Sequence, residues 1–307
     1  MKQEDFREKS YWLTTRDYRP GETLKADLNV DVAIVGGGFT GLSTAYHLKK
    51  AEPGLRVAIM ESQVVGFGAS GRNGGFNMTL FGLTLGVTAL RFGKAKARAS
   101  HHYMEKAVDL LRDLVAELNL DCDYEHPGFL RVATTQTYRR RILEEIELAH
   151  RLGLEGIHWL EKDQLDRQVS SDRYLGAWWE PRCGILNPAK LAWSWRDVLD
   201  PMGVKIYEHT PVIEISRGGG KVILHTPAGL VRAEKTVLAT NAWSHFFPRL
   251  RRKQIPVWTH IVLTEPLSET HFKRIGWRNL VLPCPRSAMT CAICCRVPSF
   301  CPTACAR

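Results

Sequence analysis

Short apolar runs alternate with amphipathic stretches along the first half of the chain, in the pattern of a mixed α/β fold. Residues 31–35 form an apolar run typical of a strand that is buried on both faces of a parallel sheet. Residues 39–50 carry apolar side chains at helical spacing, and a second apolar strand is predicted over residues 56–60. The pattern therefore predicts one complete strand–turn–helix–strand unit.

The rest of the pattern predicts two further groups of elements. An amphipathic helix over 101–120 is expected to cover the sheet, and an antiparallel sheet with helices is expected from residues 128–134, 136–152 and 158–160. The chain then returns to the first domain through a capped helix, a meander with glycine turns, and a buried strand that opens into a loop. These later elements are expected at residues 187–199, 204–207, 210–215, around 218–220 and 228–229, and at 235–243, with Val237 and Leu238 in the core.

Three glycines stand where the first strand turns into the first helix. Gly36, Gly38 and Gly41 form the pattern G-x-G-x-x-G, in which they allow the tight turn, the approach of a pyrophosphate, and close packing of helix on strand. Glu61 ends the second strand, where a carboxylate can accept hydrogen bonds from ribose hydroxyls and would repel a 2′-phosphate. A structural glycine turn is the alternative, but the strand, helix, second strand and acidic end are all in register and favour a dinucleotide.

A second glycine-rich stretch follows at residues 66–75. Its Gly, Ser and Asn residues let the backbone wrap closely around a ligand and offer several N–H donors. A flexible surface loop is the alternative. The position of the stretch, directly after the strand that ends at Glu61, favours the ligand-binding interpretation.

Together these two segments resemble one family. VAIVGGGFTGLSTAYHL, followed by VGFGASGRNGGF, is similar to the FAD-dependent oxidoreductases of the D-amino-acid oxidase group, and most similar to gamma-glutamylputrescine oxidase-like proteins, whose Ser-Tyr-Trp segment matches residues 10–12. The resemblance covers roughly residues 8–278. It implies an α/β fold with a Rossmann-like FAD-binding domain and an incomplete α+β substrate domain. The expected domains are an arm at 1–28, a discontinuous FAD-binding domain at 29–98 and 184–247, and a partial substrate domain at 99–183 and 248–278.

The resemblance also implies which residues contact FAD. In the family the second loop runs under the pyrophosphate, the backbone of the residue matching Val212 bonds the adenine, and the segment matching Ala239 and Thr240 approaches the cofactor. The predicted cofactor-binding set is Gly36, Gly38, Phe39, Thr40, Gly41, Glu61, Ser62, Gly68, Ala69, Ser70, Arg72, Asn73, Gly74, Val212, Ala239 and Thr240.

The reaction that the resemblance implies is oxidation of a C–N bond in an amine or amino acid. A hydride passes to the flavin, the imine hydrolyses, and oxygen is the acceptor. No catalytic residue is assigned, because the histidines are scattered without an orienting partner, and surface or core roles are expected for them. Trp178 and Trp179 beside Glu180 could line an amine pocket, although one core and one edge position is the more common outcome for adjacent aromatic residues. The histidines concerned include His101, His102, His126 and His245.

Charge and composition exclude other classes. No apolar run approaches the roughly 18 residues that a membrane-spanning helix needs, and the polar start lacks the features of a secretory signal, so a cytoplasmic location is expected. The formal net charge of +10 is spread over short clusters without a nucleic-acid motif, which favours solvated faces over nucleic-acid binding. The predicted partner is a small amine or amino acid.

The last residues, 279–307, break with this pattern. They hold six of the eight cysteines and show no apolar periodicity, so they are expected to lie outside the fold. A zinc site is the alternative, because Cys291 and Cys294, and Cys301 and Cys305, have ligand-like spacing. We expect no metal, and the alternative to an active enzyme is a truncated, non-catalytic remnant that binds flavin weakly or not at all.

Overall fold

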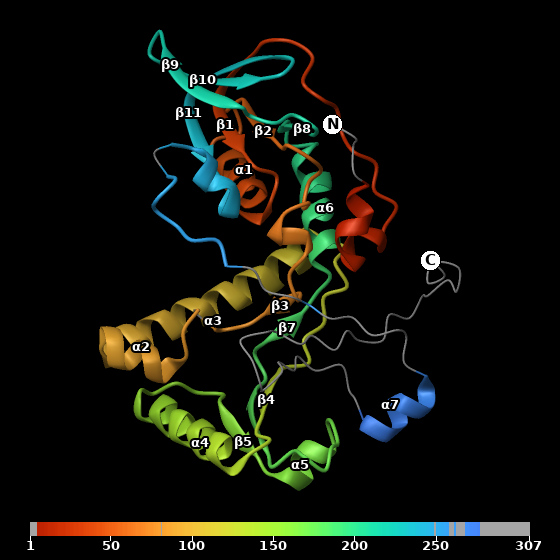
Figure 1. The fold of residues 1–307 in the computed structure, drawn as a ribbon, viewed down its shortest axis with the longest axis vertical. Helices are drawn as coiled ribbons and strands as arrows, with labels where there is room; N and C mark the ends of the chain where they lie inside the picture. Colours follow the sequence, from red (N-terminus) through yellow and green to blue (C-terminus); the bar gives the residue numbers. More distant parts are fainter. Residues whose placement is uncertain (1–4, 81, 249, 258–260, 262–267, 277–307) are drawn as a thin grey trace. The chain divides into compact units, whose positions relative to one another are not determined.

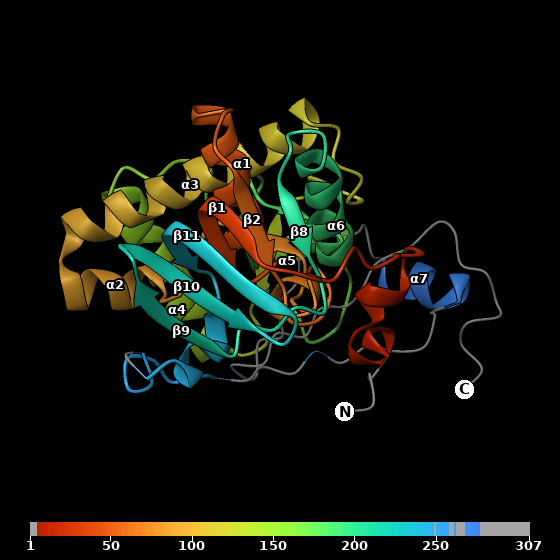
Figure 2. The same ribbon diagram turned by 90° about the horizontal axis from the view of Figure 1, so that it is seen from above.

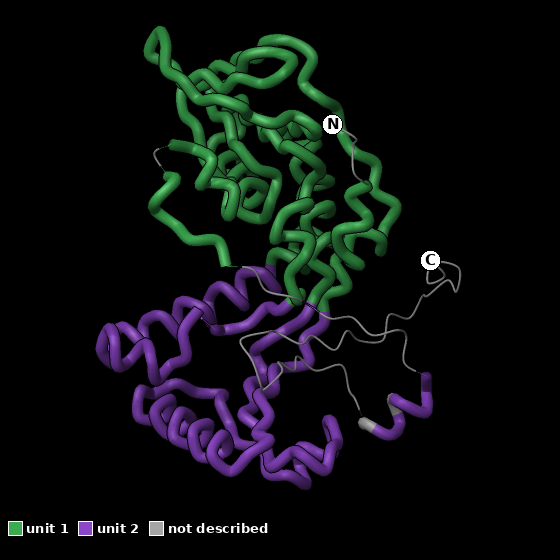
Figure 3. Tube along the Cα trace, viewed as in Figure 1, with its two compact units in different colours: residues 1–75, 114–124, 186–258 green, residues 76–113, 125–185, 259–307 purple. Residues whose placement is uncertain are grey.

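The computed structural model describes residues 5–80, 82–248, 250–257, 261 and 268–276. They fall into two compact units (Figure 3): unit 1 comprises residues 1–75, 114–124 and 186–258, and unit 2 comprises 76–113, 125–185 and 259–307. These boundaries differ from the expected ones. The chain leaves unit 1 after Gly75 rather than after residue 98, because the next strand, Phe76–Asn77, pairs with Gly184–Ile185 of unit 2. The arm at 1–28 belongs to unit 1.

Unit 1 is built on a six-stranded sheet in the order β8-β2-β1-β11-β10-β9 (Figures 1 and 2). The first four of these strands are parallel, and β10 and β9 add an antiparallel edge. In register, Val35 at the end of β1 faces Met60 on β2 and Leu238 on β11. The strands are β1 (Leu28–Val35), β2 (Val57–Met60), β8 (Lys205–Tyr207), β9 (Glu214–Gly218), β10 (Lys221–Thr226) and β11 (Gly229–Leu238).

Two helices pack together beside this sheet. The side chains of Tyr46 on α1 (Phe39–Ala51) and Trp195 on α6 (Pro188–Leu199) meet edge to face, with ring centroids 5.0 Å apart. Asn187 caps α6 by accepting a 3.2 Å hydrogen bond from Lys190 N–H, as its place before Pro188 predicts. Short 3₁₀ turns complete unit 1: η1 (Phe6–Lys9), η2 (Tyr11–Thr14), η3 (Ala69–Gly71) and η4 (Asn241–Phe246).

One expectation about the end of the sheet is wrong. Residues 235–238 are not a separate buried strand but the end of the ten-residue strand β11. Leu238 is 38% exposed and Val237 is half-buried. The reason is that burial of a strand face requires a second layer above it, and the described residues leave this end of β11 partly uncovered.

Unit 2 is built on a three-stranded antiparallel sheet in the order β4-β6-β5. Ile142 and Ile146 of α4 pack on one face with Trp178, and Leu165 of α5 packs on the other, where Trp179 also contacts the core. Both tryptophans therefore pack against core clusters. The elements are β3 (Phe76–Asn77), α2 (Leu85–Phe92), α3 (Lys94–Glu117), β4 (Phe129–Val132), α4 (Gln136–Arg151), β5 (His158–Leu160), α5 (Lys162–Asp166), β6 (Ala177–Glu180), β7 (Gly184–Ile185) and α7 (Glu269–Ile275), with the last residues of α3 in unit 1.

Candidate functional site

The parallel strands of unit 1 bring three predicted segments to one edge of the sheet. Gly36 follows β1, Glu61 follows β2 and Ala239 follows β11, and these three strands run in the same direction in register. Backbone hydrogen bonds continue beyond the strands, because Gly36 N–H donates to Met60 O at 2.8 Å and Ala239 N–H donates to Val35 O at 2.9 Å. The carboxyl edge of a parallel sheet is where open α/β folds bind ligands.

The glycine turn has no room for side chains at two of its positions. A Cβ on Gly41 would lie 2.0 Å from the carbonyl oxygen of Gly36, and a Cβ on Gly36 would lie 2.5 Å from the carbonyl oxygen of Ala239. Gly36 also has φ +111°, which other residues rarely adopt. Gly38 differs, because its Cβ would meet only the hydroxyl of Ser70, at 2.8 Å. A side chain at Gly38 would therefore have to displace the Ser70 hydroxyl, but no backbone atom.

Glu61 is held by backbone amides. Its carboxylate accepts hydrogen bonds from Gly37 N–H at 2.7 Å and from Gln63 N–H at 2.9 Å, and from the Ser62 hydroxyl at 3.3 Å. Burial raises the pKa of Glu61, and the bonds to Gln63, Gly37 and Ser62 oppose the rise. Gly37 was absent from the predicted set. It occupies the variable position between Gly36 and Gly38, and its backbone amide orients the side chain of Glu61.

The second glycine-rich loop lies beside the first helix. The Ser70 hydroxyl accepts a 2.9 Å hydrogen bond from Phe39 N–H, the first helical amide, and Gly66 N–H donates to Gly37 O at 3.0 Å. Asn73 folds the loop on itself: its side-chain amide donates to Ala69 O at 3.1 Å and Ser70 O at 3.0 Å. The hydrogen bond between Phe39 and Ser70 thus joins the two predicted segments across 31 residues of sequence.

Arg72 carries the clearest sign of a missing ligand. Its Nε and Nη2 atoms are buried and have no hydrogen-bond partner among the described residues, while its guanidinium lies 4.2 Å above the ring of Phe67. Burial lowers the pKa of Arg72. Arg72 as a whole is half-buried, and an anion such as a phosphate would give its two buried donors an acceptor.

The remaining predicted residues lie around the same edge. Thr40 and Ser62 are exposed, Gly68 and Gly74 are half-buried, and Val212 packs against the apolar face of the sheet. The Thr240 hydroxyl lies 2.8 Å from that of Ser244 in η4. The backbone N–H of Thr210 donates a 2.8 Å hydrogen bond to Glu61 O. This bond keeps the segment that precedes Val212 near the end of β2.

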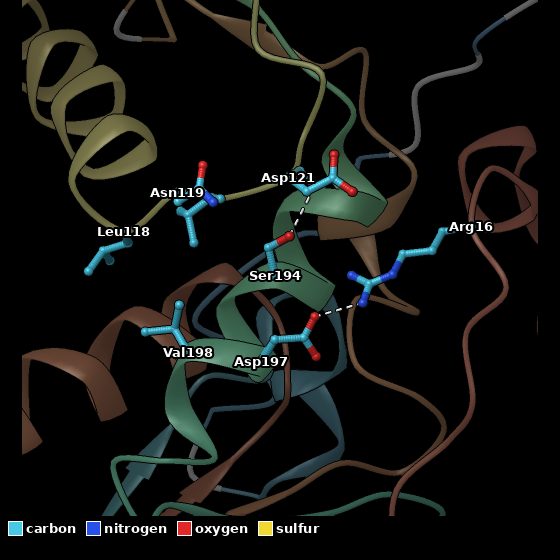
Figure 4. Close-up of a pocket in the computed structure, with 8 residues that line it drawn as sticks. Arg16, Leu118, Asn119, Asp121, Ser194, Asp197 and Val198 are labelled. Atoms are coloured by element: carbon cyan, nitrogen blue, oxygen red, sulfur yellow. Dashed lines mark hydrogen bonds and ion pairs between the residues drawn. The ribbon is translucent and has the colours of Figure 1, made fainter. Parts of the chain in front are cut away.

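A shallow hollow elsewhere on unit 1 contains none of the predicted residues (Figure 4). Arg16 pairs with Asp197 at 2.7 Å there, and the Ser194 hydroxyl donates to Asp121 O at 2.9 Å. The charge of Arg16 is thus paired within the hollow, and the Asp121 carboxylate lies 4.0 Å from Lys190 outside it. Its lining is Arg16, Leu118, Asn119, Leu120, Asp121, Ser194, Asp197 and Val198.

One expectation about the histidines is corrected. His102 has an orienting partner, because its Nδ1 lies 2.6 Å from the Glu105 carboxylate. His126 and His245 bond to backbone carbonyl oxygens, and His101 is buried. Sequence reasoning missed the first pair because His and Glu three residues apart on a helix form a very common pattern.

Metal chemistry is not indicated by the part of the chain that the structure describes. There, no group of three or more His, Cys, Asp or Glu side chains is placed to hold an ion. Cys122 and Cys183 are both buried and free. The four cysteines of the alternative zinc site, and the whole of 279–307, lie outside the described residues. No described helix is both long enough and apolar enough to cross a membrane.

The residues at the carboxyl edge fit a dinucleotide. Gly38 stands at the start of α1, Arg72 has two buried donors without a partner among the described residues, and Glu61 is oriented at the end of β2, and these features are compatible with a bound dinucleotide. A bound FAD would be held by these residues, and the flavin would supply the redox chemistry.

Comparison with known proteins identifies the same cofactor. Residues 31–290 match the family model described as DAO, FAD dependent oxidoreductase. The chain is 34% identical to gamma-glutamylputrescine oxidoreductase of Escherichia coli (strain K12) over 261 residues, which are 84% of this chain and 60% of that protein. It is 27% identical to glycine oxidase of Bacillus licheniformis, over 78% of this chain and 65% of the relative.

Solved structures agree with the sequence comparison. Glycine oxidase from Geobacillus kaustophilus superposes with a TM-score of 0.63 at 25% identity, over 72% of this chain and 58% of that one. L-amino acid deaminase from Proteus myxofaciens gives a TM-score of 0.62 at 25% identity, over 78% and 52%. The predicted fold class, enzyme class and cofactor, FAD, are confirmed. The chain spans about 60% of the length of the E. coli relative, and it belongs to the family of FAD dependent oxidoreductases.

Proposed function

We propose that this chain binds FAD at the carboxyl edge of the sheet in unit 1, as part of an oxidoreductase that acts on a C–N bond of a small amine or amino acid. One observation carries the proposal. The glycine turn, the acidic end of β2 and the second glycine-rich loop are joined by hydrogen bonds from Gly37 N–H to Glu61 and from Phe39 N–H to Ser70. Unit 1 is then the FAD-binding domain, and unit 2 is part of the substrate domain.

Each group has a separate role in this proposal. The amides at the start of α1 and the Arg72 guanidinium bind the pyrophosphate, because both offer positive charge to an anion. Gly38 lets the phosphate oxygens approach the backbone, and Glu61 accepts hydrogen bonds from the ribose. The backbone of Val212 bonds the adenine, and Ala239 and Thr240 line the path toward the flavin.

The substrate assignment rests on the relatives. Those that the chain resembles include a gamma-glutamylputrescine oxidoreductase, glycine oxidases and a sarcosine oxidase subunit beta from Arthrobacter sp. We favour an amine of the gamma-glutamylputrescine type, with oxygen as acceptor. FAD would supply the redox step by accepting hydride from the carbon that bears the amine. The protein would orient that carbon and exclude water. A cytoplasmic location remains a prediction.

Replacing Gly38 by alanine tests the cofactor site. The backbone at Gly38 has φ −87° and accepts a side chain, and the added Cβ would meet only the Ser70 hydroxyl, so the fold should persist. The methyl group would displace the Ser70 hydroxyl, which accepts the hydrogen bond from Phe39 N–H and joins the two glycine-rich segments of the proposed pyrophosphate site, so we expect FAD affinity to fall about tenfold. Gly54→Ala is the matched control, because its Cβ would meet nothing within 4 Å.

The readouts are flavin fluorescence on titration with FAD and identification of the nucleotide released by heating the purified chain. Retention of FAD by the parent chain and Gly54→Ala, with weakened retention by Gly38→Ala, supports the proposal. Release of NAD, or equal FAD affinity in all three chains, contradicts it. A parent chain that is colourless once excess FAD has been removed favours the alternative of a non-catalytic remnant.

A further inference from the structure

The amino-terminal arm contacts the second glycine-rich loop at its far end. The indole Nε1–H of Trp12 donates a 2.9 Å hydrogen bond to the carbonyl oxygen of Asn73, a residue 61 positions later. Asn73 in turn holds the loop together, because its side chain bonds Ala69 O, Ser70 O and the amide of Gly75. The arm therefore contacts the residue on which the shape of the loop depends.

The arm also packs against the middle of the loop. Leu13 is wholly buried, and a Cβ built on Gly71 would lie 3.1 Å from its Cδ2 and 2.3 Å from the carbonyl oxygen of Gly66. The loop can therefore approach the arm this closely only because position 71 has no side chain.

A buried carboxylate links the arm to the near end of the loop. Glu208, just after β8, is wholly buried and accepts hydrogen bonds from the amides of Val65 and Gly21 and, at 2.8 Å, from the hydroxyl of Tyr18. Val65 directly precedes the loop, and Gly21 and Tyr18 belong to the arm. Arg196 of α6 lies 3.5 Å from the same carboxylate and stabilises its charge.

An aromatic stack keeps this link in place. The ring of Tyr18 lies 4.7 Å from that of Trp193, nearly parallel at 11°, and Trp193 Nε1–H donates to Val65 O at 3.1 Å. Arg196 donates to the Tyr18 hydroxyl at 2.6 Å. Both the amide and the carbonyl of Val65 are thus bonded within a cluster to which the arm contributes Tyr18.

We propose that the arm is a working part of the cofactor site, in which Trp12 and Tyr18 are positioning residues that hold the two ends of the loop 65–75 in the conformation that receives the FAD pyrophosphate. This proposal rests on the proposed function. The physical reason is preorganisation, since a loop already fixed before binding loses less conformational entropy when the ligand arrives.

Two conservative substitutions test the arm. Trp12→Phe removes the donor to Asn73 and keeps an aromatic ring, and Tyr18→Phe removes the hydroxyl that bonds Glu208 and keeps the stack on Trp193. We expect each to weaken FAD binding about three- to tenfold, the effect of one lost hydrogen bond that positions a loop. Thr14→Val is the control, because the Thr14 hydroxyl bonds only Tyr11 O within the arm, at 2.8 Å.

The measurements are the dissociation constant for FAD, the melting temperature without FAD, and amide hydrogen exchange of residues 66–75 without FAD. The proposal expects faster exchange in the loop and a higher dissociation constant for both variants. The melting temperature of Trp12→Phe should stay close to that of Thr14→Val, whereas Tyr18→Phe should melt lower, because it also removes a donor from the buried carboxylate of Glu208. If the parent chain binds FAD and Trp12→Phe binds it equally tightly with unchanged loop exchange, the arm proposal is wrong. A parent chain that binds no FAD contradicts the proposed function and, with it, this role of the arm.

Discussion

Glu61 of unit 1 and Glu180 of unit 2 are carboxylates that the chain holds in different ways. In unit 1 the backbone amides of Gly37 and Gln63 hold Glu61 at the open end of a parallel strand. In unit 2 Glu180 is 4% exposed, accepts a 2.8 Å hydrogen bond from the Thr79 hydroxyl, and lies 3.8 Å from the imidazole of His101. Backbone donors leave the surrounding edge free for a ligand, whereas side-chain donors fill the space around the carboxylate.

The polar groups of unit 2 continue into a closed network. Glu105 contacts His102 at 2.6 Å and Arg182 at 3.7 Å, and Arg182 also pairs with Asp109. Such groups are costly to bury unless they are paired, so the network is expected to specify the packing of unit 2 rather than to bind a ligand. The comparison teaches that burial and a shifted pKa do not by themselves mark a binding site.

The largest effect is expected from Gly41→Ala in unit 1. The new Cβ would lie 2.0 Å from the Gly36 carbonyl oxygen, so the turn between β1 and α1 cannot keep its shape. We expect a loss of about 3 kcal/mol in the free energy of unfolding and loss of FAD binding. Urea unfolding and flavin titration measure both, with Gly54→Ala as the control. Unchanged stability would mean that the turn adapts and that the tight packing of α1 on β1 is not required.

A smaller effect is expected from Thr79→Val in unit 2. The substitution keeps the shape of the side chain and removes the hydroxyl donor to buried Glu180, which should cost about 2 kcal/mol. Exposed Thr137 on α4 provides the control, Thr137→Val. Urea unfolding followed by tryptophan fluorescence measures the change. If the two variants are equally stable, Glu180 does not depend on Thr79, and the contrast between the units weakens.

The smallest expected effect is the pH dependence of the stability of unit 2, which arises from His101 beside the buried Glu180. Burial lowers the pKa of His101 below its usual 6.5, with Glu105 opposing and His102 and Arg182 adding to the shift. Below pH 6.5 the unfolded chain therefore binds more protons than the folded chain, so the stability of unit 2 should fall as the pH falls, by at most about 1.4 kcal/mol per pH unit.

Replacing His101 by glutamine should remove this slope. Urea midpoints measured at pH 5 and pH 7 give it directly, and His158→Gln, at an exposed position on β5, is the control. The prediction fails if His101→Gln keeps the full dependence of the parent chain. Glu180 cannot be the source of that dependence, because burial raises its pKa and a carboxyl of this kind stabilises the folded chain as the pH falls.

Short-range patterns predicted much of unit 1. The helix expected over 39–50 is α1 (Phe39–Ala51), and the helix expected from Asn187 to residue 199 is α6 (Pro188–Leu199). Both follow from local rules: apolar periodicity, a capping side chain, and glycine where a turn has no space. The predicted cofactor residues remain a prediction, although those whose contacts are described here gather at one edge of the sheet.

The arm shows what such patterns could not predict. Trp12 was noted only within the Ser-Tyr-Trp segment of the arm, and Tyr18 and Glu208 were not singled out. The three residues nevertheless bond to the loop, to Val65 or to one another across separations of 61 to 190 residues. A hydrogen bond between one side chain and a group far away in the sequence leaves no repeating pattern from which it could be predicted.

The sequence by itself determined the glycine turn, the helix that follows it and the acidic end of β2, because spacing along a few residues controls each of them. The tertiary structure alone decided that β11 is one long, partly exposed strand, that His102 faces Glu105, that the chain leaves unit 1 at Gly75, and that the arm touches the cofactor loop. These features depend on which surfaces meet in the folded chain, and burial and hydrogen bonding between distant segments are settled only when the whole unit packs.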